Sequence, residues 1–409
     1  MHVCMVLRKP FPRDVRVEKE AHALLAAGHD VTLLCRGEED RPARETHDGI
    51  EVCRVSETDL DPLHRQRLSL GYLVTTVHRF WADALRSIHA QRAIDVIHVH
   101  DLPLVPTGLS VGAETGSRVV ADLHENYPEA IRQWRRMHAP SDVVTNVGLL
   151  SKYLALPVRR WKRIERRAVR DADHVLTVCQ EGRTHYLEDC GAPASRVSVV
   201  GNTVEVDRDW FDPDAPPVEG YEDEFVVSYV GKYAPHRGLE AVVEGFAELL
   251  ETVPEARLLL VGAPGNERYG ERFHAHCERQ GVLDRTTFTG WVDFERVPNY
   301  MAASDVCLVP HADTPHTNTT VPHKLFQYMA MGKPVLVSDV PPLKRIVGGT
   351  GSGLVAEAGN PEAMAGALRR LASDEGLRSR LGQNGRAAVD GRFNWSRDAE
   401  TLVGVYECI

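Results

Sequence analysis

The sequence has no Cys-x-x-Cys pair, and its eight cysteines are scattered over 409 residues. Several of them lie inside apolar segments such as VTLLCR and ASDVCLVP. Thiols in such surroundings are typical of small buried side chains in a reducing compartment. The pattern excludes a scaffold held together by disulfides.

Long hydrophobic runs are also lacking, so we expect no membrane-spanning helix. The first residues form a strand pattern and not a secretory signal, which predicts a cytoplasmic protein. A net charge of -10 argues against general nucleic-acid binding. Nineteen histidines are present, but none forms an HExxH motif, and His98 and His100 alternate along a strand. We therefore expect no dedicated metal site.

What the chain does have is the composition of a globular protein, with 43% hydrophobic and 26% charged residues. Its length exceeds what one hydrophobic core usually supports, so two domains are expected. Short apolar segments alternate with amphipathic helical segments, which indicates parallel sheets with right-handed crossovers. In the first half, the expected strands are Val3–Leu7, Val31–Cys35, Ile50–Val55, Asp95–Val99, Arg118–Leu123, Val175–Val178 and Val197–Val200, and a long helix is expected over Leu68–Ala90.

Two ionisable pairs follow expected strands of this first half. His100-Asp101 ends one strand and His124-Glu125 ends the next. Ligands of open parallel sheets bind beyond the carboxyl ends of the strands. These pairs are therefore candidates for a functional site.

A segment rich in Asp, Pro and Gly, from Gly201 to Tyr221, separates a second half of the same kind. We expect domains at 1–205 and 223–392, a linker at 206–222 and a terminal helix at 393–409. Strands of the second half are expected at Phe225–Val230, Arg257–Val261, Thr286–Phe288, Val306–Val309 and Val335–Val337. Together these patterns predict two doubly wound, Rossmann-like α/β domains facing a cleft.

The stretch His316–Asp339 has the order loop, helix, turn, strand. Thr319 or Thr320 is expected to cap the helix, with Pro322 in its first turn. Leu325, Phe326, Met329 and Ala330 form an apolar face, while Lys324 and Gln327 point away from it. The start of such a helix favours an anion, because its free N–H groups and its dipole both attract negative charge. A capped helix with a solvated polar side is the alternative.

Two further features need separate interpretations. The glycine-rich segment 348–353 follows a helix and precedes a strand, which is the reverse of a dinucleotide-binding loop. The segment from Arg132 to Arg170 carries eleven cations against Asp142 and Glu165, an excess of nine positive charges, with Trp134, Tyr153 and Trp161 interleaved. This segment is either a solvated helix face or a contact for anionic lipid or a phosphate-bearing acceptor.

Over nearly all of its length, the chain resembles a retaining glycosyltransferase of family 4, which has the GT-B fold. Each motif alone is moderate evidence, but six in the right order are strong. The segments that carry the resemblance are DVRVEKEAHALLAAGHDVTLL, DVIHVHDLP with VVADLHENYPE, DADHVLTVCQEG with VVGNTVEV, VGKYAPHRGLE, FTGWVDFERVPNYMAASDVCLVP with VPHKLFQYMAMGKPVLVSD, and FNWSRDAETLVGVY. The last resembles the family's terminal helix, which crosses back to the first domain.

The resemblance implies roles for particular residues. Lys232 and Arg237 would bind the donor diphosphate, which suits two cations in a loop before a helix. His124 would hydrogen-bond the donor sugar. The donor-binding set would be Thr319, Thr320, Lys324, Gln327, Trp291 and Val292, with Arg16, Asp101 and Glu125 contacting or orienting the acceptor.

The chain departs from the family at three places. Thr319 and Gln327 stand where the family usually has its two paired glutamates, and KPFPRDVR replaces the usual glycine-rich first loop. The missing acids weaken any role for a carboxylate nucleophile at these positions and leave the donor sugar open. Arg16, the last residue of this altered segment, is then a candidate for contact with a phosphate or the acceptor.

The resemblance implies a metal-independent, retaining transferase that needs no cofactor. It would move a sugar from a nucleotide diphosphate, UDP- or GDP-linked, to a hydroxyl of a sugar, lipid-linked or small-molecule acceptor. Peripheral contact with an anionic membrane is a further expectation. A sugar-nucleotide epimerase of similar fold and an inactive nucleotide-sugar-binding relative are the alternatives.

Overall fold

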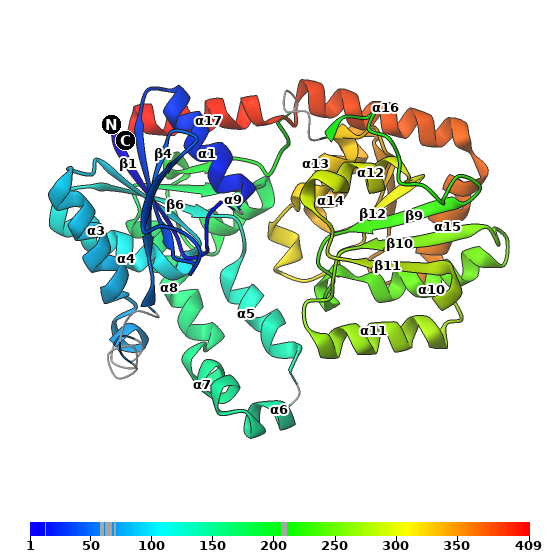
Figure 1. Ribbon diagram of the computed structural model, residues 1–409, viewed down its shortest axis with the longest axis horizontal. Coiled ribbons are helices and arrows are strands. Elements are labelled where there is room, and N and C mark those ends of the chain that lie inside the picture. Colours follow the sequence, from blue (N-terminus) through cyan, green and yellow to red (C-terminus); the bar gives the residue numbers. More distant parts are fainter. Residues whose placement is uncertain (13, 58–60, 62–67, 69–70, 139, 206–210) are drawn as a thin grey trace. The chain divides into compact units, whose positions relative to one another are not determined.

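The protein is described by a computed structural model that covers the chain except residues 13, 58–60, 62–67, 69–70, 139 and 206–210. It divides into two compact units. Unit 1 comprises Met1–Val200 and Asp398–Ile409, and unit 2 comprises Gly201–Arg397. Each unit has a parallel sheet flanked by helices (Figure 1), as the alternating sequence pattern predicted. The linker expected at 206–222 begins after the boundary between the units, and its residues 206–210 lie outside the described residues.

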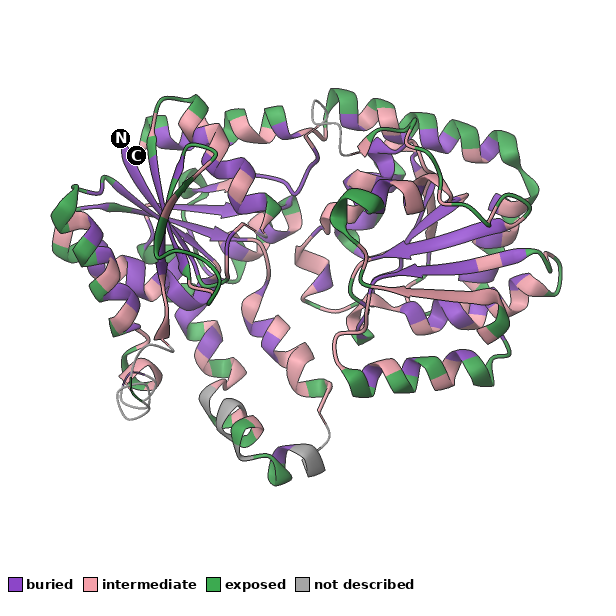
Figure 2. Cartoon of the chain, viewed as in Figure 1, coloured by how far each residue is buried: buried purple, intermediate pink, exposed green. Residues whose placement is uncertain are grey.

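The sheet of unit 1 has the strand order β3-β4-β2-β1-β5-β6-β7-β8. Only the pairing of β3 with β4 is antiparallel among the pairings of the described residues. β1 and β5 are buried along their whole length, which fits continuous apolar segments at the centre of a covered parallel sheet (Figure 2). The strands are β1 (His2–Leu7), β2 (Asp30–Arg36), β3 (Arg44–His47), β4 (Ile50–Val55), β5 (Val96–His100), β6 (Arg118–Leu123), β7 (His174–Thr177) and β8 (Val197–Val199).

The single helix expected over Leu68–Ala90 is wrong for its described part. Helix α3 begins only at Arg79, and Thr76 interrupts the chain before it with a positive φ of 63°. The interruption falls in the run Val74-Thr75-Thr76-Val77, whose β-branched side chains are poorly suited to a helix. The helices of unit 1 are α1 (Val15–Ala26), α3 (Arg79–Gln91), α4 (Val105–Thr115), α5 (Tyr127–Arg136), α6 (Pro140–Thr145), α7 (Val147–Ala155), α8 (Val158–Asp171) and α9 (Gln180–Glu188).

The sheet of unit 2 has the order β11-β10-β9-β12-β13-β14, and all its recorded pairings are parallel. Its strands are β9 (Phe225–Val230), β10 (Ala256–Val261), β11 (Thr286–Gly290), β12 (Val306–Val309), β13 (Val335–Ser338) and β14 (Gly353–Ala356). Its helices are α10 (Leu239–Leu250), α11 (Glu267–Arg279), α12 (Val297–Ala302), α13 (His323–Ala330), α14 (Pro341–Thr350), α15 (Pro361–Ser373) and α16 (Glu375–Gly391). The segment 348–353 joins α14 to β14, so its interpretation as a helix end is confirmed.

Glycines end the neighbouring strands β9 and β10 of this sheet. Gly231 and Gly262 have φ values of 118° and 134°, which side-chain-bearing residues rarely adopt. A β-carbon on Gly262 would lie 2.4 Å from the carbonyl oxygen of Gly231. The two strand ends therefore meet backbone to backbone, an approach that a side chain at Gly262 would block.

The tail forms helix α17 (Trp395–Cys408), close to the helix expected at 393–409. Its residues from Asp398 onward belong to unit 1, which agrees with the predicted return of the tail to the first domain. The Tyr406 hydroxyl lies 2.5 Å from His98 Nδ1 at the centre of that unit. None of the described helices is long and apolar enough to cross a membrane.

Candidate functional site

The two ionisable pairs of the first half meet at one edge of the unit 1 sheet. β5 and β6 are neighbours in parallel register, so their carboxyl ends lie together. His124 Nε2 lies 3.0 Å from Asp101 Oδ1. Asp101 has a φ of 67° and a ψ of 141°, an unusual conformation for a residue with a side chain. Strain of this kind is often found at functional sites.

A buried ion pair lies beneath this edge. Arg16, at the start of α1, donates from Nε and Nη2 to the two carboxylate oxygens of Asp122 on β6, over 2.8 and 2.7 Å. Its Nη1 donates to the carbonyl oxygen of Val200, and its Nη2 also lies 2.9 Å from Glu20 Oε1. Arg16 and Asp122 are almost wholly buried. A bidentate pair of this kind fixes the position of α1 on the sheet.

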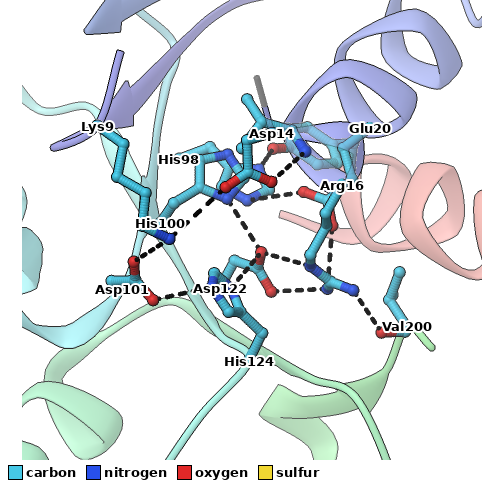
Figure 3. A network of polar contacts seen from close by, with 12 residues as sticks. Lys9, Asp14, Arg16, Glu20, His98, His100, Asp101, Asp122, His124 and Val200 are labelled. Atoms are coloured by element: carbon cyan, nitrogen blue, oxygen red, sulfur yellow. Dashed lines mark hydrogen bonds and ion pairs between the residues drawn. The ribbon is translucent and has the colours of Figure 1, made fainter. Parts of the chain in front are cut away.

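Histidines extend the network across β5 (Figure 3). His100 Nδ1 lies 3.0 Å from Asp122, and the ring of His98 stacks on that of His100 with centroids 4.6 Å apart. His98 Nε2 lies 3.4 Å from Glu20 Oε2. Burial raises the pKa of Glu20 to about 7 against the opposing charge of Arg16. Burial also lowers the pKa of His98 well below its ordinary value.

At the carboxyl ends of β5 and β6, neighbouring groups stabilise the ionised form of Asp101 and the protonated form of His124. Burial alone would raise the pKa of Asp101, but the charge and hydrogen bond of His124 hold it below its ordinary value. Burial opposes protonation of His124, yet Asp101 raises its pKa well above the usual range. Lys9 lies 3.6 Å from both Asp101 and Asp14. The edge thus presents an imidazolium–carboxylate pair beside an ammonium.

The structure does not support the expected contact of Arg16 with a ligand. Its guanidinium is 2% exposed and its donors are occupied by Asp122, Glu20 and Val200. Sequence reasoning missed these buried partners, although an aspartate within the apolar segment VVADL is a recognisable signal. Four residues of this network have side chains that can bind a divalent cation: Glu20, His98, His100 and Asp122. The guanidinium of Arg16 already supplies their positive charge, so the set does not fit a metal.

A cavity opens at the carboxyl ends of β2 and β4 in unit 1. Its lining mixes cations and acids around one aromatic side chain. The residues are Arg8, Arg36, Gly37, Glu38, Glu39, Arg41, Ala43, Arg54, Val55, Ser56, Glu57 and Trp81. Asp101 and Glu125 are not among them, although both belong to the same unit.

In unit 2, the loop after β9 carries the cations predicted to bind phosphate. Lys232 is exposed, whereas Arg237 is half-buried and donates from Nη1 to His311 Nε2 over 2.8 Å. Arg237 ends a short 3-10 turn, and Gly238 follows it with a φ of 68°. A β-carbon on Gly238 would lie 2.0 Å from the carbonyl oxygen of Pro310. Only glycine fits this close approach between the loop and the chain after β12.

Lys324 joins this loop from the first turn of α13. Its Nζ lies 3.6 Å from the centre of the Tyr229 ring, a cation–π contact. A β-carbon on Gly231 would lie 3.0 Å from the same nitrogen. The neighbouring Tyr328 accepts a hydrogen bond from the backbone N–H of Val230 over 2.8 Å, which fixes α13 against β9. Tertiary packing thus holds the ammonium beside the end of β9.

Among the described residues, Arg237 adds positive charge beside Lys324, His236 and His311, and no carboxylate shifts the pKa values of these three groups. Burial lowers the pKa values of Lys324, His236 and His311, and Arg237 lowers all three further. The pKa of His236 falls to about 3. The neighbours that lower these pKa values are Arg237, Lys324 and histidines. We call Arg237, Lys324, His236 and His311 the cation cluster.

The predicted cap of α13 is wrong. Thr319 ends a short 3-10 turn, with its hydroxyl donating to the carbonyl oxygen of Pro315, and Thr320 is extended. Pro322 occupies the N-cap position, where no side-chain oxygen accepts from the helix. The chain is extended at Thr320, so both threonines lie before the capping position, which Pro322 occupies. The first N–H groups of α13 therefore lack a side-chain cap.

The remaining predicted donor-binding residues lie on two elements of unit 2. On α13, Leu325, Phe326, Met329 and Ala330 are buried as expected, together with Tyr328. Gln327 is partly exposed on the other side of the helix, three residues after Lys324. Trp291 and Val292 follow β11; Trp291 is 72% exposed and Val292 is half-buried. The structure records no contact of Trp291 or Val292 with the cation cluster among its described residues.

The basic segment Arg132–Arg170 forms helices α5 to α8. Part of its charge is neutralised within unit 1, since Lys162 lies 2.7 Å and Arg132 3.2 Å from Glu129. Val144 on α6 and Leu154 on α7 are 76% and 74% exposed. The described part of this segment therefore combines exposed apolar side chains with exposed arginines on α8.

Comparison with known proteins identifies both halves. The family model for glycosyl transferases group 1 matches residues 212–388, and the glycosyl transferase 4-like domain matches residues 14–203. The chain is 28% identical to D-inositol 3-phosphate glycosyltransferase of Acidothermus cellulolyticus, an alignment that covers 96% of this chain and 84% of that protein. It is 25% identical to alpha-D-kanosaminyltransferase of Streptomyces kanamyceticus, over 61% of this chain and 64% of that protein.

A solved structure shares the fold along the whole chain. Sucrose-phosphate synthase of Thermosynechococcus elongatus aligns with a TM-score of 0.77 and 21% identity, covering 100% of this chain and 98% of that one. The strand order of each unit and the two family matches agree with this likeness. The chain therefore belongs to the family 4, group 1 glycosyltransferases and has the GT-B fold, as the resemblance predicted.

Proposed function

We propose that this glycosyltransferase moves a sugar from a nucleotide diphosphate, UDP- or GDP-linked, to an acceptor hydroxyl, with retention and without a metal. The observation that carries the proposal is the cation cluster, in which no carboxylate of the described residues shifts the pKa values of Lys324, His236 or His311. A diphosphate bound there would meet Arg237, Lys324 and the uncapped start of α13. The same groups would stabilise the negative charge that develops as the diphosphate leaves.

The proposed division of labour assigns the nucleotide to unit 2 and the acceptor to unit 1. The cavity at the ends of β2 and β4 would take the acceptor, because ligands of parallel sheets bind at this edge. His124 and Asp101 would supply a proton donor and an acceptor at the ends of β6 and β5, further along the same sheet edge. Glu125 stays a proposed orienting residue of this unit. The acceptor proposed here is a compound with a free hydroxyl group.

The proposed activity is tested by incubating the chain with a panel of UDP- and GDP-sugars and acceptors. Release of nucleoside diphosphate that depends on an acceptor, and is equal with EDTA or with added magnesium, is the expected result. The anomeric proton of the product gives its configuration. Interconversion of the sugar nucleotide without acceptor would show the epimerase, and binding without turnover would show the inactive relative. Activity lost with EDTA and restored by magnesium or manganese would contradict metal independence.

Arg237→Ala should impair transfer more than Lys232→Ala. Arg237 is half-buried and can hold a diphosphate with two parallel hydrogen bonds, whereas Lys232 is exposed and acts as a point charge. We expect a loss of about 2–4 kcal/mol in transition-state stabilisation for Arg237, read from kcat/KM. Lys232→Ala is the matched control, and melting temperatures report folding. Equal effects of both variants would contradict the proposed contact of Arg237 with the diphosphate.

Gln327→Ala should weaken nucleotide binding by about 1–2 kcal/mol, mainly through KM, because a ribose contact is the same in ground and transition states. Gln327→Glu should keep or tighten binding, since a carboxylate accepts from both ribose hydroxyls. Calorimetric titration of the nucleoside diphosphate into both variants measures this. No change in the alanine variant, or loss of binding in a folded glutamate variant, would contradict the ribose contact.

We propose peripheral membrane contact through the segment Arg132–Arg170. Each cation near an anionic surface contributes on the order of 1 kcal/mol, and the exposed apolar side chains of α6 and α7 can enter the interface. Flotation should show binding to anionic but not neutral vesicles, weakening with salt. Arg159→Gln with Arg163→Gln should reduce it, and Arg272→Gln with Arg279→Gln on α11 is the control. Equal flotation with neutral and anionic vesicles would contradict the membrane contact and support the alternative that the segment is a solvated helix face.

A further inference from the structure

A second ionisable cluster lies in unit 1, on other elements than the proposed donor and acceptor sites. It joins Glu165 of α8, His185 of α9 and Cys190, which follows the end of α9. Glu165 and Cys190 are buried, and the His185 side chain is 15% exposed. The cluster is small, but it combines the three side-chain types that bind zinc.

Three atoms of the cluster converge on one point. Cys190 Sγ lies 3.8 Å from Glu165 Oε2 and 3.8 Å from His185 Nε2, and the last two atoms are 3.5 Å apart. Ligand atoms around a tetrahedral zinc at normal bond lengths are about 3.3–3.6 Å apart. In the plane of the three atoms, the point equidistant from them lies about 2.1 Å from each, which matches zinc–nitrogen and zinc–oxygen bonds and is about 0.2 Å shorter than a zinc–sulfur bond. An ion fits there after a contraction of a few tenths of an ångström.

The backbone and an outer carboxylate support this arrangement. Gly191 takes a φ of 76° and turns the chain back after α9, and the N–H of Cys190 bonds to the carbonyl oxygen of His185. His185 Nδ1 lies 2.8 Å from Asp189 Oδ2. A proton on Nδ1 donated to that carboxylate leaves the lone pair of Nε2 directed at Cys190 and Glu165. Metal-bound histidines usually have such a partner on their second nitrogen.

The position of Glu165 is unusual for its helix. α8 carries six arginines and one lysine, yet the recorded partners of Glu165 are His185 and Cys190. The neighbouring Lys162 pairs with Glu129 instead. A carboxylate oxygen and an imidazole lone pair at this separation repel one another unless a positive charge lies between them. That charge is either a proton on His185, which makes an ordinary buried ion pair, or a metal ion.

We propose that Glu165, His185 and Cys190 form a site for a zinc-type divalent cation, with water as fourth ligand. Binding converts the Cys190 thiol to a thiolate, and its proton leaves to solvent. The ion would join α8 to the end of α9, a stabilising role. The proposal differs from the sequence-based expectation of no metal site. It is separate from the proposed transfer reaction, because thiolate ligands select soft cations over magnesium.

Cobalt(II) titration of the metal-free full-length chain tests the site. We expect one ion per chain, with the intense near-ultraviolet charge-transfer absorption of a cobalt–thiolate bond. Cys190→Ser should abolish this absorption, and Cys277→Ser, which alters a buried thiol of unit 2, should retain it. Asp189→Asn alters an exposed side chain, so folding should be preserved, and it should weaken affinity about 10- to 100-fold.

Zinc should displace the cobalt and raise the melting temperature of the wild-type chain. Wild-type protein without thiolate absorption at stoichiometric cobalt would overturn the proposal and leave an ion pair between His185 and Glu165. Absorption that persists in Cys190→Ser, or affinity unchanged in Asp189→Asn, would also overturn it. Transfer activity is not needed for any of these readouts, so a failed metal site and a failed transferase assignment are distinguishable.

Discussion

The half-buried amino group of Lys324 is the constraint on which the proposed nucleotide site of unit 2 depends. It lies over the face of Tyr229, near Arg237, and burial together with Arg237 lowers its pKa. A protonated Lys324 is costly in this setting until an anion binds, because burial and the charge of Arg237 both oppose its protonation. A bound diphosphate would raise the pKa values of the cluster, so anion binding and protonation of Lys324 would favour each other.

The fold supplies what side chains alone could not. Parallel strands bring the β9 loop and the start of α13 to one edge of the unit 2 sheet. Glycines after β9 and β10 let the two strand ends approach each other closely, and Gly238 allows the loop to touch the chain after β12. In unit 1, the corresponding edge of the sheet contains a buried ion pair between Arg16 and Asp122, beneath His124. Removing one partner of such a buried pair is typically far more costly than losing an exposed one.

Most of the fold was predictable because parallel α/β units repeat a simple pattern of apolar strands and amphipathic helices. Strands such as Arg118–Leu123 and Phe225–Val230 have the expected bounds. The break at Thr76 was missed because helical periodicity continues across a β-branched run. The cap of α13 was missed because capping depends on the local course of the chain at Thr320, which residue type alone does not determine.

The candidate site was predictable in part for a similar reason. Residues at strand ends, such as Asp101 and His124, follow from topology. The predicted ligand contact of Arg16 is not supported, because Arg16 pairs with the buried Asp122 on β6. From the sequence alone, a cation near a loop looks like a ligand contact. His311 was missed since it follows β12, about seventy residues from Arg237, and only the folded sheet joins them. Non-local pairs of this kind leave no periodic trace in the sequence.

The central claim is that the phosphates, more than the base or the sugar, hold the donor to unit 2. Titration of a nucleoside diphosphate and of its parent nucleoside at several salt concentrations tests this most directly. Two charge-assisted contacts are together worth about 3–6 kcal/mol, so the nucleoside should bind at least about 100-fold more weakly than the diphosphate. The affinity of the diphosphate should also fall as salt rises. Equal affinities for the nucleoside and the diphosphate, unaffected by salt, would contradict the account.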